Sequence, residues 1–297
     1  MYIQMFAKLS NPAGPCCAVI IATKGRHDQL RSISLPSVCR QLCSPVKVIL
    51  VADACAVSGA LAREYALLLG ALELVVLSNC RAAGAAGAWN TGLDYLQADK
   101  FDGFVALLDD DDAWDENHLS ENMAAAQRGR ANVVISGLRL MRDGIACDRK
   151  LPRNFNDRMF LTGNPGWQGS NTFVSLQALR AVGGFRDGMA SSNDRDLAVR
   201  LLRMSDVRVS YTGKWTATWH LASGRQTLSS PEADSKLRGL RWLWQIYGAE
   251  MEPSETEEFF SRSKKLFGLE RAEIISYMDD CPPHREPRGD FISRPPQ

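Results

Sequence analysis

The chain lacks features that would place it among membrane-spanning, secreted or nucleic-acid-binding proteins. It has no apolar run of about 18 residues, the length that a membrane-spanning helix needs. Residues 1–15 contain Lys8, Asn11 and two prolines, and they lack the apolar stretch of a secretory signal. Neither sign of charge dominates, because 35 basic residues stand against 34 acidic ones. We therefore expect a cytoplasmic protein without a nucleic-acid partner.

Cysteine and glycine patterns argue against two further classes. The eight cysteines are scattered, and the close pairs lack the repeated CxxC spacing of a zinc site. We expect reduced thiols, since disulfides are rare in cytosolic proteins. No GxGxxG motif follows an apolar strand, and Gly84 and Gly87 are wrongly spaced for one. A dinucleotide-binding dehydrogenase is therefore disfavoured.

Apolar runs alternate with helix-like segments through the first part of the chain. The runs are short and continuous, as is typical of buried parallel strands, and they lie at 17–22, 46–51, 72–77 and 104–108. Segments with helical spacing separate them, at 28–43, 57–70 and 88–98, and Pro36 interrupts or kinks the first of these. The alternation predicts an α/β fold with a mostly parallel sheet flanked by helices.

The second part of the chain is less regular. Strand candidates lie at 132–136, 138–141 and 207–211, and the last of them leads to Trp215 and His220. Helical patterning marks 177–182, 194–204, 232–248 and 254–266. The end of the chain, from Cys281, is rich in proline and arginine, so we expect a flexible tail there.

Polar residues follow the predicted strands of the first part. Thr23 and Arg26 come after the first strand, Asp53 after the second and Arg81 after the third. Four aspartates, Asp109–Asp112, end the fourth. Because ligands of open parallel sheets bind outside the carboxyl ends of the strands, we expect these side chains to form one binding site.

The four consecutive carboxylates predict a metal site. Like charges repel one another, and a buried strand directly before them limits their access to solvent. Mg²⁺ and Mn²⁺ prefer oxygen ligands and keep positions open for phosphate oxygens. The alternative is an exposed acidic loop in which Asp112 begins the next helix.

The order of these motifs resembles that of the GT-A glycosyltransferases of family 2. Four stretches resemble the nucleotide-binding half of that family: VIIATKGR (19–26), VILVADA (48–54), GAAGAWNTGL (84–93) and FVALLDDDDAW (104–114). Its acceptor half is resembled by GSNTFVSLQALRAVGGF (169–185) and SNDRDLAVRL (192–201). The resemblance covers about residues 19–220, and it implies a GT-A, Rossmann-like fold.

The resemblance also implies roles for individual residues. It implies that Asp109 and Asp111 form a DxD motif, with Asp111 as the direct ligand of Mn²⁺ or Mg²⁺ and Asp109 as a second candidate. Asp110 or Asp109 would meet the ribose or a metal-bound water. Asp194 corresponds to the catalytic base of inverting members, and His220 to a late metal ligand of some relatives. The nucleotide-binding candidates are Thr23, Arg26, Asp53, Arg81, Asn90, Asp109 and Asp110.

Three further residues are candidates on weaker grounds. Trp167 and Ser170 could line a sugar pocket, although a tryptophan also serves for plain packing. Arg225 could contact phosphate from a loop. Asp194 has an alternative role as a helix cap, and His220 could be an ordinary core histidine. Departures from the family pattern at Ala22, Lys24, Trp89 and Asn193 leave the donor sugar open.

The domain organisation follows from the resemblance and from the change in composition. We expect a leader at 1–15, a GT-A catalytic domain at 16–230, a helical appendage at 231–280 and a flexible tail at 281–297. Within the domain, 16–114 would bind the nucleotide and 115–230 the acceptor.

The sequence thus predicts an inverting, metal-dependent enzyme that moves a sugar from a nucleotide diphosphate sugar to an acceptor hydroxyl. A UDP-sugar is the favoured donor, and the acceptor would be a saccharide, a lipid-linked molecule or a small molecule. A lipid-linked acceptor would bring the protein to the membrane surface, and a homodimer is compatible with the sequence. Two alternatives stay open: a sugar-phosphate nucleotidyltransferase, although ATKGR (22–26) lacks its glycine-rich loop, and an inactive nucleotide-sugar-binding module.

Overall fold

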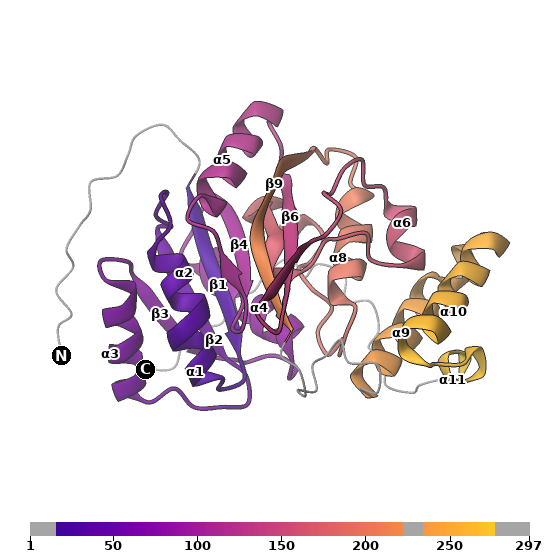
Figure 1. Ribbon diagram of the computed structural model, residues 1–297, viewed down its shortest axis with the longest axis horizontal. Helices are drawn as coiled ribbons and strands as arrows, with labels where there is room; N and C mark the ends of the chain where they lie inside the picture. Colours follow the sequence, from indigo (N-terminus) through magenta and orange to yellow (C-terminus); the bar gives the residue numbers. More distant parts are fainter. Residues whose placement is uncertain (1–15, 222–233, 277–297) are drawn as a thin grey trace.

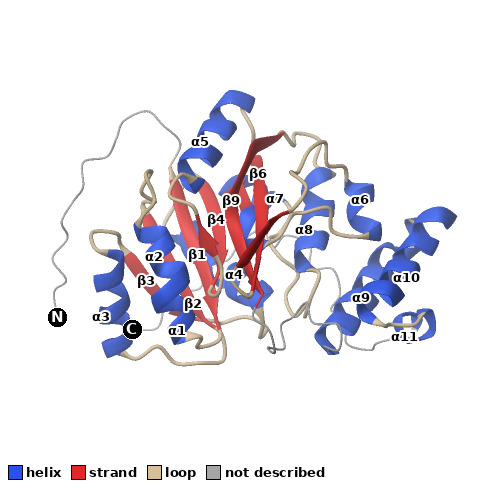
Figure 2. Ribbon diagram, in the orientation of Figure 1, coloured by secondary structure: helices blue, strands red, loops and turns tan. Residues whose placement is uncertain are grey.

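The computed structural model describes residues 16–221 and 234–276. Within these residues, nine strands form one sheet in the order β3-β2-β1-β4-β8-β6-β9-β5, and β7 pairs with β6 (Figures 1 and 2). The strands are β1 (Cys17–Thr23), β2 (Lys47–Ala52), β3 (Leu74–Ser78), β4 (Phe104–Asp109), β5 (Ala113–Trp114), β6 (Val133–Arg142), β7 (Ile145–Asp148), β8 (Thr172–Ser175) and β9 (Val209–Leu221).

The four predicted parallel strands are confirmed. β1 pairs in parallel with β2 and β4, and β2 pairs in parallel with β3. The crossovers contain α3 (Gly59–Leu69) and α4 (Ala85–Ala98), both close to their predicted bounds. The α/β fold with a mostly parallel sheet flanked by helices is therefore also confirmed.

Helices cover both faces of the sheet because alternate strand residues point to opposite sides. Ile20 and Ile49 face the core under α4 and α8 (Asn193–Leu202). Val19 and Leu50 face a second core, to which α2 (Leu35–Cys39), α3 and α5 (His118–Gly129) contribute. The continuous apolar pattern of β1 and β2 follows from this burial on two faces.

The predicted helix at 28–43 is shorter and less regular in the structure. A turn of α-helix, α1 (His27–Gln29), leads into a π-helical turn (Leu30–Ser34) and then into α2, which ends at Cys39. Pro36 lies in the first turn of α2, where its missing N–H costs no helical hydrogen bond. The proline therefore interrupts the segment, as the sequence allowed.

Pairing in the second part of the chain differs from the expectation. The candidates at 132–136 and 138–141 are one strand, β6, which has register shifts around Gly137 against β9. The predicted strand 207–211 extends through Trp215 and His220 as β9 and runs parallel to β6. β8, which was not predicted, is antiparallel to both β4 and β6. A Cβ at Gly137 would lie 2.8 Å from the Lys214 carbonyl oxygen, so only glycine fits there.

The remaining helices complete the second part of the chain. α6 (Asp157–Thr162) and α7 (Leu176–Ala181) precede α8. The C-terminal helices α9 (Asp234–Tyr247), α10 (Pro253–Phe267) and α11 (Arg271–Ile275) lie together at one end of the molecule, at the right of Figure 1. Among the described residues, no helix combines the length and the apolar composition needed to cross a membrane.

Candidate active site

The carboxyl ends of β1, β2 and β4 bring the first predicted site residues to one edge of the sheet. Ala22 in β1 pairs with Val51 in β2 and with Asp109 in β4. Thr23 and Asp53 follow directly, on adjacent strand ends, and both side chains are buried. The register therefore brings polar side chains from three strands together, as the parallel arrangement predicts.

The first strand end holds the acidic loop in place. Thr23 Oγ1 donates a 2.7 Å hydrogen bond to Asp110 Oδ2. Arg26 Nη1 donates to Asp110 Oδ1 at 2.8 Å and to Asp111 Oδ2 at 2.6 Å. Burial raises the pKa of the Asp110 carboxyl, while the positive charge of Arg26 opposes the rise. Thr23 and Arg26 thus stabilise the turn that carries the carboxylates.

Asp109 is a strongly perturbed carboxyl at this edge. Burial raises its pKa to about 7, and the nearby charges of Asp111 and Asp110 add to the rise. The charge of Asp194, far away in the sequence, acts in the same direction. Asp109 and Asp194 therefore belong to one electrostatic site, which is typical of catalytic centres.

Asp112 joins three segments and does not begin a helix. Its carboxylate is buried, accepting a 2.6 Å hydrogen bond from Ser170 Oγ and a 3.0 Å bond from the His220 backbone N–H. Ser170 Oγ in turn accepts from the Asp109 backbone N–H. The helix cap suggested for Asp112 is wrong, because α5 begins at His118, behind Asn117. Asp112 and Ser170 instead shape the loop that carries Asp109.

His220 lies beside the acidic loop, near the end of β9. Burial lowers the pKa of its imidazole, and the negative charge of Asp111 opposes this effect. Its Nδ1 is buried and has no hydrogen-bond partner among the described residues. A buried ring nitrogen without a partner next to carboxylates suits a metal ion, because such a nitrogen is otherwise costly.

The donor set fits a hard divalent cation by its chemistry. Asp109 and Asp111 offer oxygen atoms and His220 offers one nitrogen, a combination that Mn²⁺ accepts and that Mg²⁺ accepts for its oxygens. No three His, Cys, Asp or Glu side chains within 16–221 and 234–276 are grouped as a preformed cage. Asp111 is held instead by Arg26.

Asp53 is buried at the end of β2 and has internal partners. Its Oδ1 accepts a 2.8 Å hydrogen bond from Asn79 Nδ2, and its Oδ2 accepts a 2.9 Å bond from the Gly84 N–H. Lys24 Nζ lies 3.8 Å from Oδ2. Gly84 has φ +117°, a conformation that side chains rarely adopt, so glycine is needed where α4 begins. Asp53 therefore fixes the loop that leads into α4.

Arg81 and Asn90 connect α4 to the loop after α7. Arg81 forms ion pairs with Asp94 at 2.6 Å and with Asp187 at 2.8 Å. Asn90 is buried and donates to the Phe185 carbonyl and to Asp187 Oδ1, both at 2.8 Å. Both side chains, which the sequence assigned to nucleotide binding, have partners within the protein and lie outside the acidic loop.

Trp167, another candidate, is packed inside the protein. Trp167 is 1% exposed; its indole N–H donates to Thr172 Oγ1 at 2.8 Å, and its ring packs edge-on against Phe160. It is part of the core, which is the packing role that the sequence left open. Arg225 lies outside the described residues.

Asp194 is partly buried near the start of α8, and its two carboxylate oxygens have different partners. Oδ1 accepts from the Arg195 N–H at 2.8 Å, and Oδ2 accepts from Asn164 Nδ2 at 2.7 Å. Burial raises the pKa of Asp194, and the charge of Lys236 in α9 is the largest opposing influence. The helix cap is Ser192, in a left-handed conformation, so capping does not explain Asp194.

Asn164 and Lys236 are site residues that the sequence did not suggest. Asn164 lies in a turn, where its Oδ1 also accepts the N–H groups of Gly166 and Trp167. Lys236 lies in the C-terminal helices, outside the region of resemblance. Neither residue belongs to a recognisable motif, and only the folded chain brings them to Asp194.

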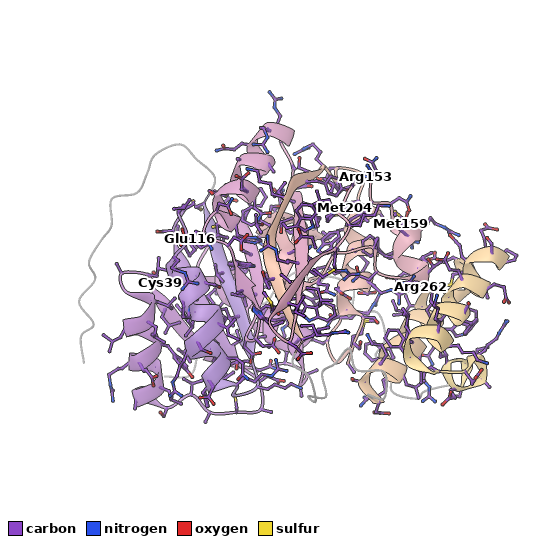
Figure 3. All side chains as sticks on the ribbon, viewed as in Figure 1. Cys39, Glu116, Arg153, Met159, Met204 and Arg262 are labelled. Atoms are coloured by element: carbon purple, nitrogen blue, oxygen red, sulfur yellow. The ribbon has the colours of Figure 1, made fainter. Side chains whose placement is uncertain are left out.

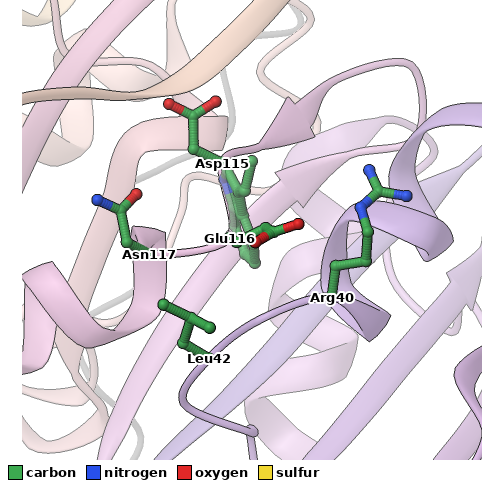
Figure 4. A pocket seen from close by; sticks show the side chains of 6 residues that line it. Arg40, Leu42, Asp115, Glu116 and Asn117 are labelled. Atoms are coloured by element: carbon green, nitrogen blue, oxygen red, sulfur yellow. The ribbon is translucent and has the colours of Figure 1, made fainter.

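A surface hollow of about 460 Å³ lies apart from these residues (Figure 4). Its lining is Arg40, Leu42, Trp114, Asp115, Glu116 and Asn117. None of the candidate site residues lines this hollow, so it does not define the active site.

Comparison with known proteins identifies the fold and the family. The family model for glycosyl transferase family 2 matches residues 18–182. The structure of S. aureus TarS residues 1–349 with UDP-GlcNAc is similar, at 17% identity and a TM-score of 0.58 over 86% of this chain and 74% of that chain. The mannosyltransferase PcManGT from Pyrobaculum calidifontis, in complex with GDP-Man and Mn²⁺, gives 17% identity and a TM-score of 0.55, over 85% and 70% of the two chains.

No curated protein matches the chain. The family match nevertheless covers more than half of it, and the similar structures share its fold. The chain therefore belongs to glycosyltransferase family 2 and is a glycosyltransferase with a GT-A fold.

Proposed function

We propose that this enzyme is an inverting, metal-dependent glycosyltransferase that uses a nucleotide diphosphate sugar, with a UDP-sugar as the favoured donor. The observation that carries the proposal is that the charge of Asp194 acts on Asp109, although the two partly buried carboxyl groups come from distant parts of the chain. One carboxylate comes from the nucleotide-binding end of the sheet and the other from the start of α8. Sugar transfer needs stabilisation of the leaving group and a base for the acceptor hydroxyl. Asp109 would belong to the first function and Asp194 to the second.

The donor would bind across the carboxyl ends of β1, β2 and β4. Asp53 would meet the base or ribose, and Thr23 and Arg26 would position the acidic loop beneath the diphosphate. Similar structures support a nucleotide-sugar donor: TarS was solved with UDP-GlcNAc and PcManGT with GDP-Man and Mn²⁺.

Asp109, Asp111 and His220 would hold the metal ion. When bound, Mn²⁺ or Mg²⁺ supplies positive charge that stabilises the departing nucleoside diphosphate. Arg26, which already contacts Asp111, supplies a second positive charge on the same side. Burial, followed by the negative charges of Asp111 and Asp110, raises the pKa of Asp109, and a bound cation would favour its ionised form.

Asp194 would accept the proton of the acceptor hydroxyl as it attacks the sugar. Its Oδ2 is oriented by Asn164, and its backbone position is fixed at the start of α8. A raised pKa suits this role, because a stronger base takes the proton more readily. The protein would act in the cytoplasm or at a membrane surface, according to whether its acceptor is lipid-linked.

The proposal is tested by a thermal-shift panel of UDP-, GDP- and dTDP-sugars with and without Mn²⁺. Binding to the native state raises the melting temperature, so one nucleotide should give a Mn²⁺-dependent shift. Asp111→Ala should remove that dependence. Asp194→Asn should keep the donor shift and reduce transfer by about 10²–10⁴-fold, the usual contribution of a general base.

The exposed Asp102 provides the matched control, because its carboxylate has no partner among the described residues. Asp102→Ala should leave both donor binding and transfer unchanged. If no nucleotide sugar shifts the wild-type protein, the chain is an inactive module and the proposal is wrong. If Asp194→Asn turns over at the wild-type rate, another residue is the base.

A further inference from the structure

Two arginines stand out from the others by their lack of partners. Arg149 and Arg262 are partly shielded from solvent, yet neither guanidinium forms a hydrogen bond or an ion pair with another described residue. Every other described arginine without a side-chain partner is exposed. A shielded cation without a counterion is costly, so this pair requires an explanation.

The surrounding surface does not lack carboxylates. Arg158 pairs with Glu255, and Arg203 pairs with Asp157 and Glu250, in the same region between α6 and α10. Arginines here are therefore normally matched within the chain. The unmatched pair points to a counterion that comes from outside the described residues.

Arg262, one of the pair, lies close to the residue that orients the proposed base. Arg262, labelled in Figure 3, packs over Gly163 so closely that a Cβ there would lie 2.7 Å from its Nε. The next residue, Asn164, donates to Asp194 Oδ2 at 2.7 Å. Gly163, which Arg262 contacts, is therefore directly followed in the chain by Asn164, the residue that orients Asp194.

The backbone of Arg149 is held by hydrogen bonds on both sides of the residue. Its N–H donates to the Leu138 carbonyl at 3.2 Å, and its own carbonyl accepts from Trp215 Nε1 at 2.6 Å. Both partners belong to the central pair of strands, β6 and β9. Its guanidinium therefore projects from a fixed backbone rather than from a free loop.

Electrostatics supports a missing anion. Burial lowers the pKa of Arg149, and the positive charge of Arg262 lowers it further. Burial also lowers the pKa of Arg195 to about 10, again with a contribution from Arg262. Arg195 is compensated by the carbonyl groups of Phe160 and Leu161, whereas Arg149 and Arg262 have no such compensation among the described residues.

We propose that Arg149 and Arg262 bind an anionic oxygen-bearing group, a phosphate or a carboxylate, on the acceptor and so hold its hydroxyl near Asp194. The proposal rests on the proposed function and deepens it by naming the acceptor class. The donor diphosphate belongs to the opposite side, at the acidic loop and Arg26. Guanidinium groups suit this task because they bind phosphate and carboxylate in a bidentate manner.

Binding is measured first, with inorganic phosphate and with glucose 6-phosphate against glucose, at constant ionic strength. The anions should stabilise the wild-type protein against thermal unfolding, and glucose should not. Arg262→Gln and Arg149→Gln should each weaken anion affinity about tenfold, since a charge-assisted contact is lost. Their melting temperatures without anion should not fall, because each change relieves repulsion.

Arg153→Gln is the matched control. Arg153 is exposed, forms no ion pair with a described residue and is well separated from Arg262 in Figure 3. This variant should bind the anions like the wild type. Equal anion affinity in the wild type, Arg262→Gln and Arg149→Gln would overturn the proposal.

Turnover is measured second, with the donor that the nucleotide-sugar panel identifies. Glucose 6-phosphate and glucuronate should show a lower KM than glucose, and Arg262→Gln should raise the KM for the anions about tenfold with little change in kcat. Arg262→Gln should keep the donor's thermal shift. No preference for anionic acceptors, with donor binding intact, would refute this inference and leave the proposed function standing.

Discussion

At the scale of single residues, burial has the largest effect on the basicity of the proposed catalytic carboxylate, Asp194, and the hydrogen bond from Asn164 is one of the influences that oppose it. Burial raises the pKa of Asp194, while the Asn164 amide and the charge of Lys236 oppose the rise by favouring the ionised form. The carboxylate is therefore more basic than an ordinary aspartate, yet it can still ionise in a buried position.

Asn164→Ala should shift the acid limb of the kcat profile to higher pH. Loss of the donated hydrogen bond disfavours the ionised carboxylate, so the pKa of Asp194 rises further and the base form appears only at higher pH. The measurement is transfer rate against pH at saturating donor. Asn117→Ala, whose side chain bonds to no other described residue, should keep the wild-type profile. An unmoved acid limb in Asn164→Ala would show that Asn164 does not tune the base.

The sequence could predict those site residues that are marked by a nearby strand end or motif. Asp53, Asp109 and Asp194 could be singled out because a strand end or a motif marks each of them. Their roles stay predictions. Asn164, Lys236 and the arginine pair could not be found, because their importance arises from contacts between segments distant in the sequence. The sequence did not reveal that Arg81 and Asn90, predicted to bind the nucleotide, both contact Asp187 within the protein.

At the scale of elements, α9 packs directly against the loop that leads into α8. A Cβ at Gly239 would lie 2.4 Å from the Ser191 carbonyl oxygen, so the helix approaches the loop as closely as glycine allows. Trp242 in the same helix is buried, and Tyr247 donates to Asp196 Oδ1 at 2.7 Å. The C-terminal helices therefore fix the segment that carries Asp194.

Gly239→Ala should reduce stability and transfer together. The added methyl group cannot fit against backbone, and overpacking of this kind costs about 1–3 kcal/mol of unfolding free energy. Chemical denaturation and the transfer assay measure the two effects. Gly59→Ala is the matched control, because its Cβ would meet only the far end of Arg63 in α3, and it should gain up to about 1 kcal/mol. An unchanged unfolding free energy in Gly239→Ala would contradict the close contact between Gly239 and the Ser191 carbonyl.

The elements themselves were predicted unevenly. Strands β1 to β4 were found because burial on both faces gives continuous apolar runs. The length of β9 and the antiparallel insertion of β8 were missed, because their partners lie far away in the sequence and pairing depends on those partners. The short β5 has no sequence signal of its own and exists through its pairing with β9.

At the scale of the whole molecule, the catalytic domain and the helical appendage predicted from the sequence share one hydrophobic core. Leu240, Trp242 and Phe259 of the C-terminal helices belong to the same buried cluster as Ile20 and Val105 of the central strands. Each fully buried large apolar side chain contributes about 1.5–3 kcal/mol, so a few of them rival the net stability of a domain, about 5–15 kcal/mol.

The full chain should therefore unfold in one cooperative transition. Scanning calorimetry should give equal calorimetric and van't Hoff enthalpies, and a chain that ends at residue 230 should fail to fold. Two resolved transitions, or a stably folded shortened chain, would instead support an independent appendage at 231–280.

The pairing of Asp112 with the His220 N–H has a consequence for the newly made protein. The two residues are 108 positions apart, so the acidic loop has no anchor on β9 until most of the chain has been synthesised. At about 5–20 residues per second, that interval lasts on the order of 5–20 s on the ribosome. If the acidic loop binds the donor as proposed, we expect a nascent chain to bind it only after β9 has entered the sheet.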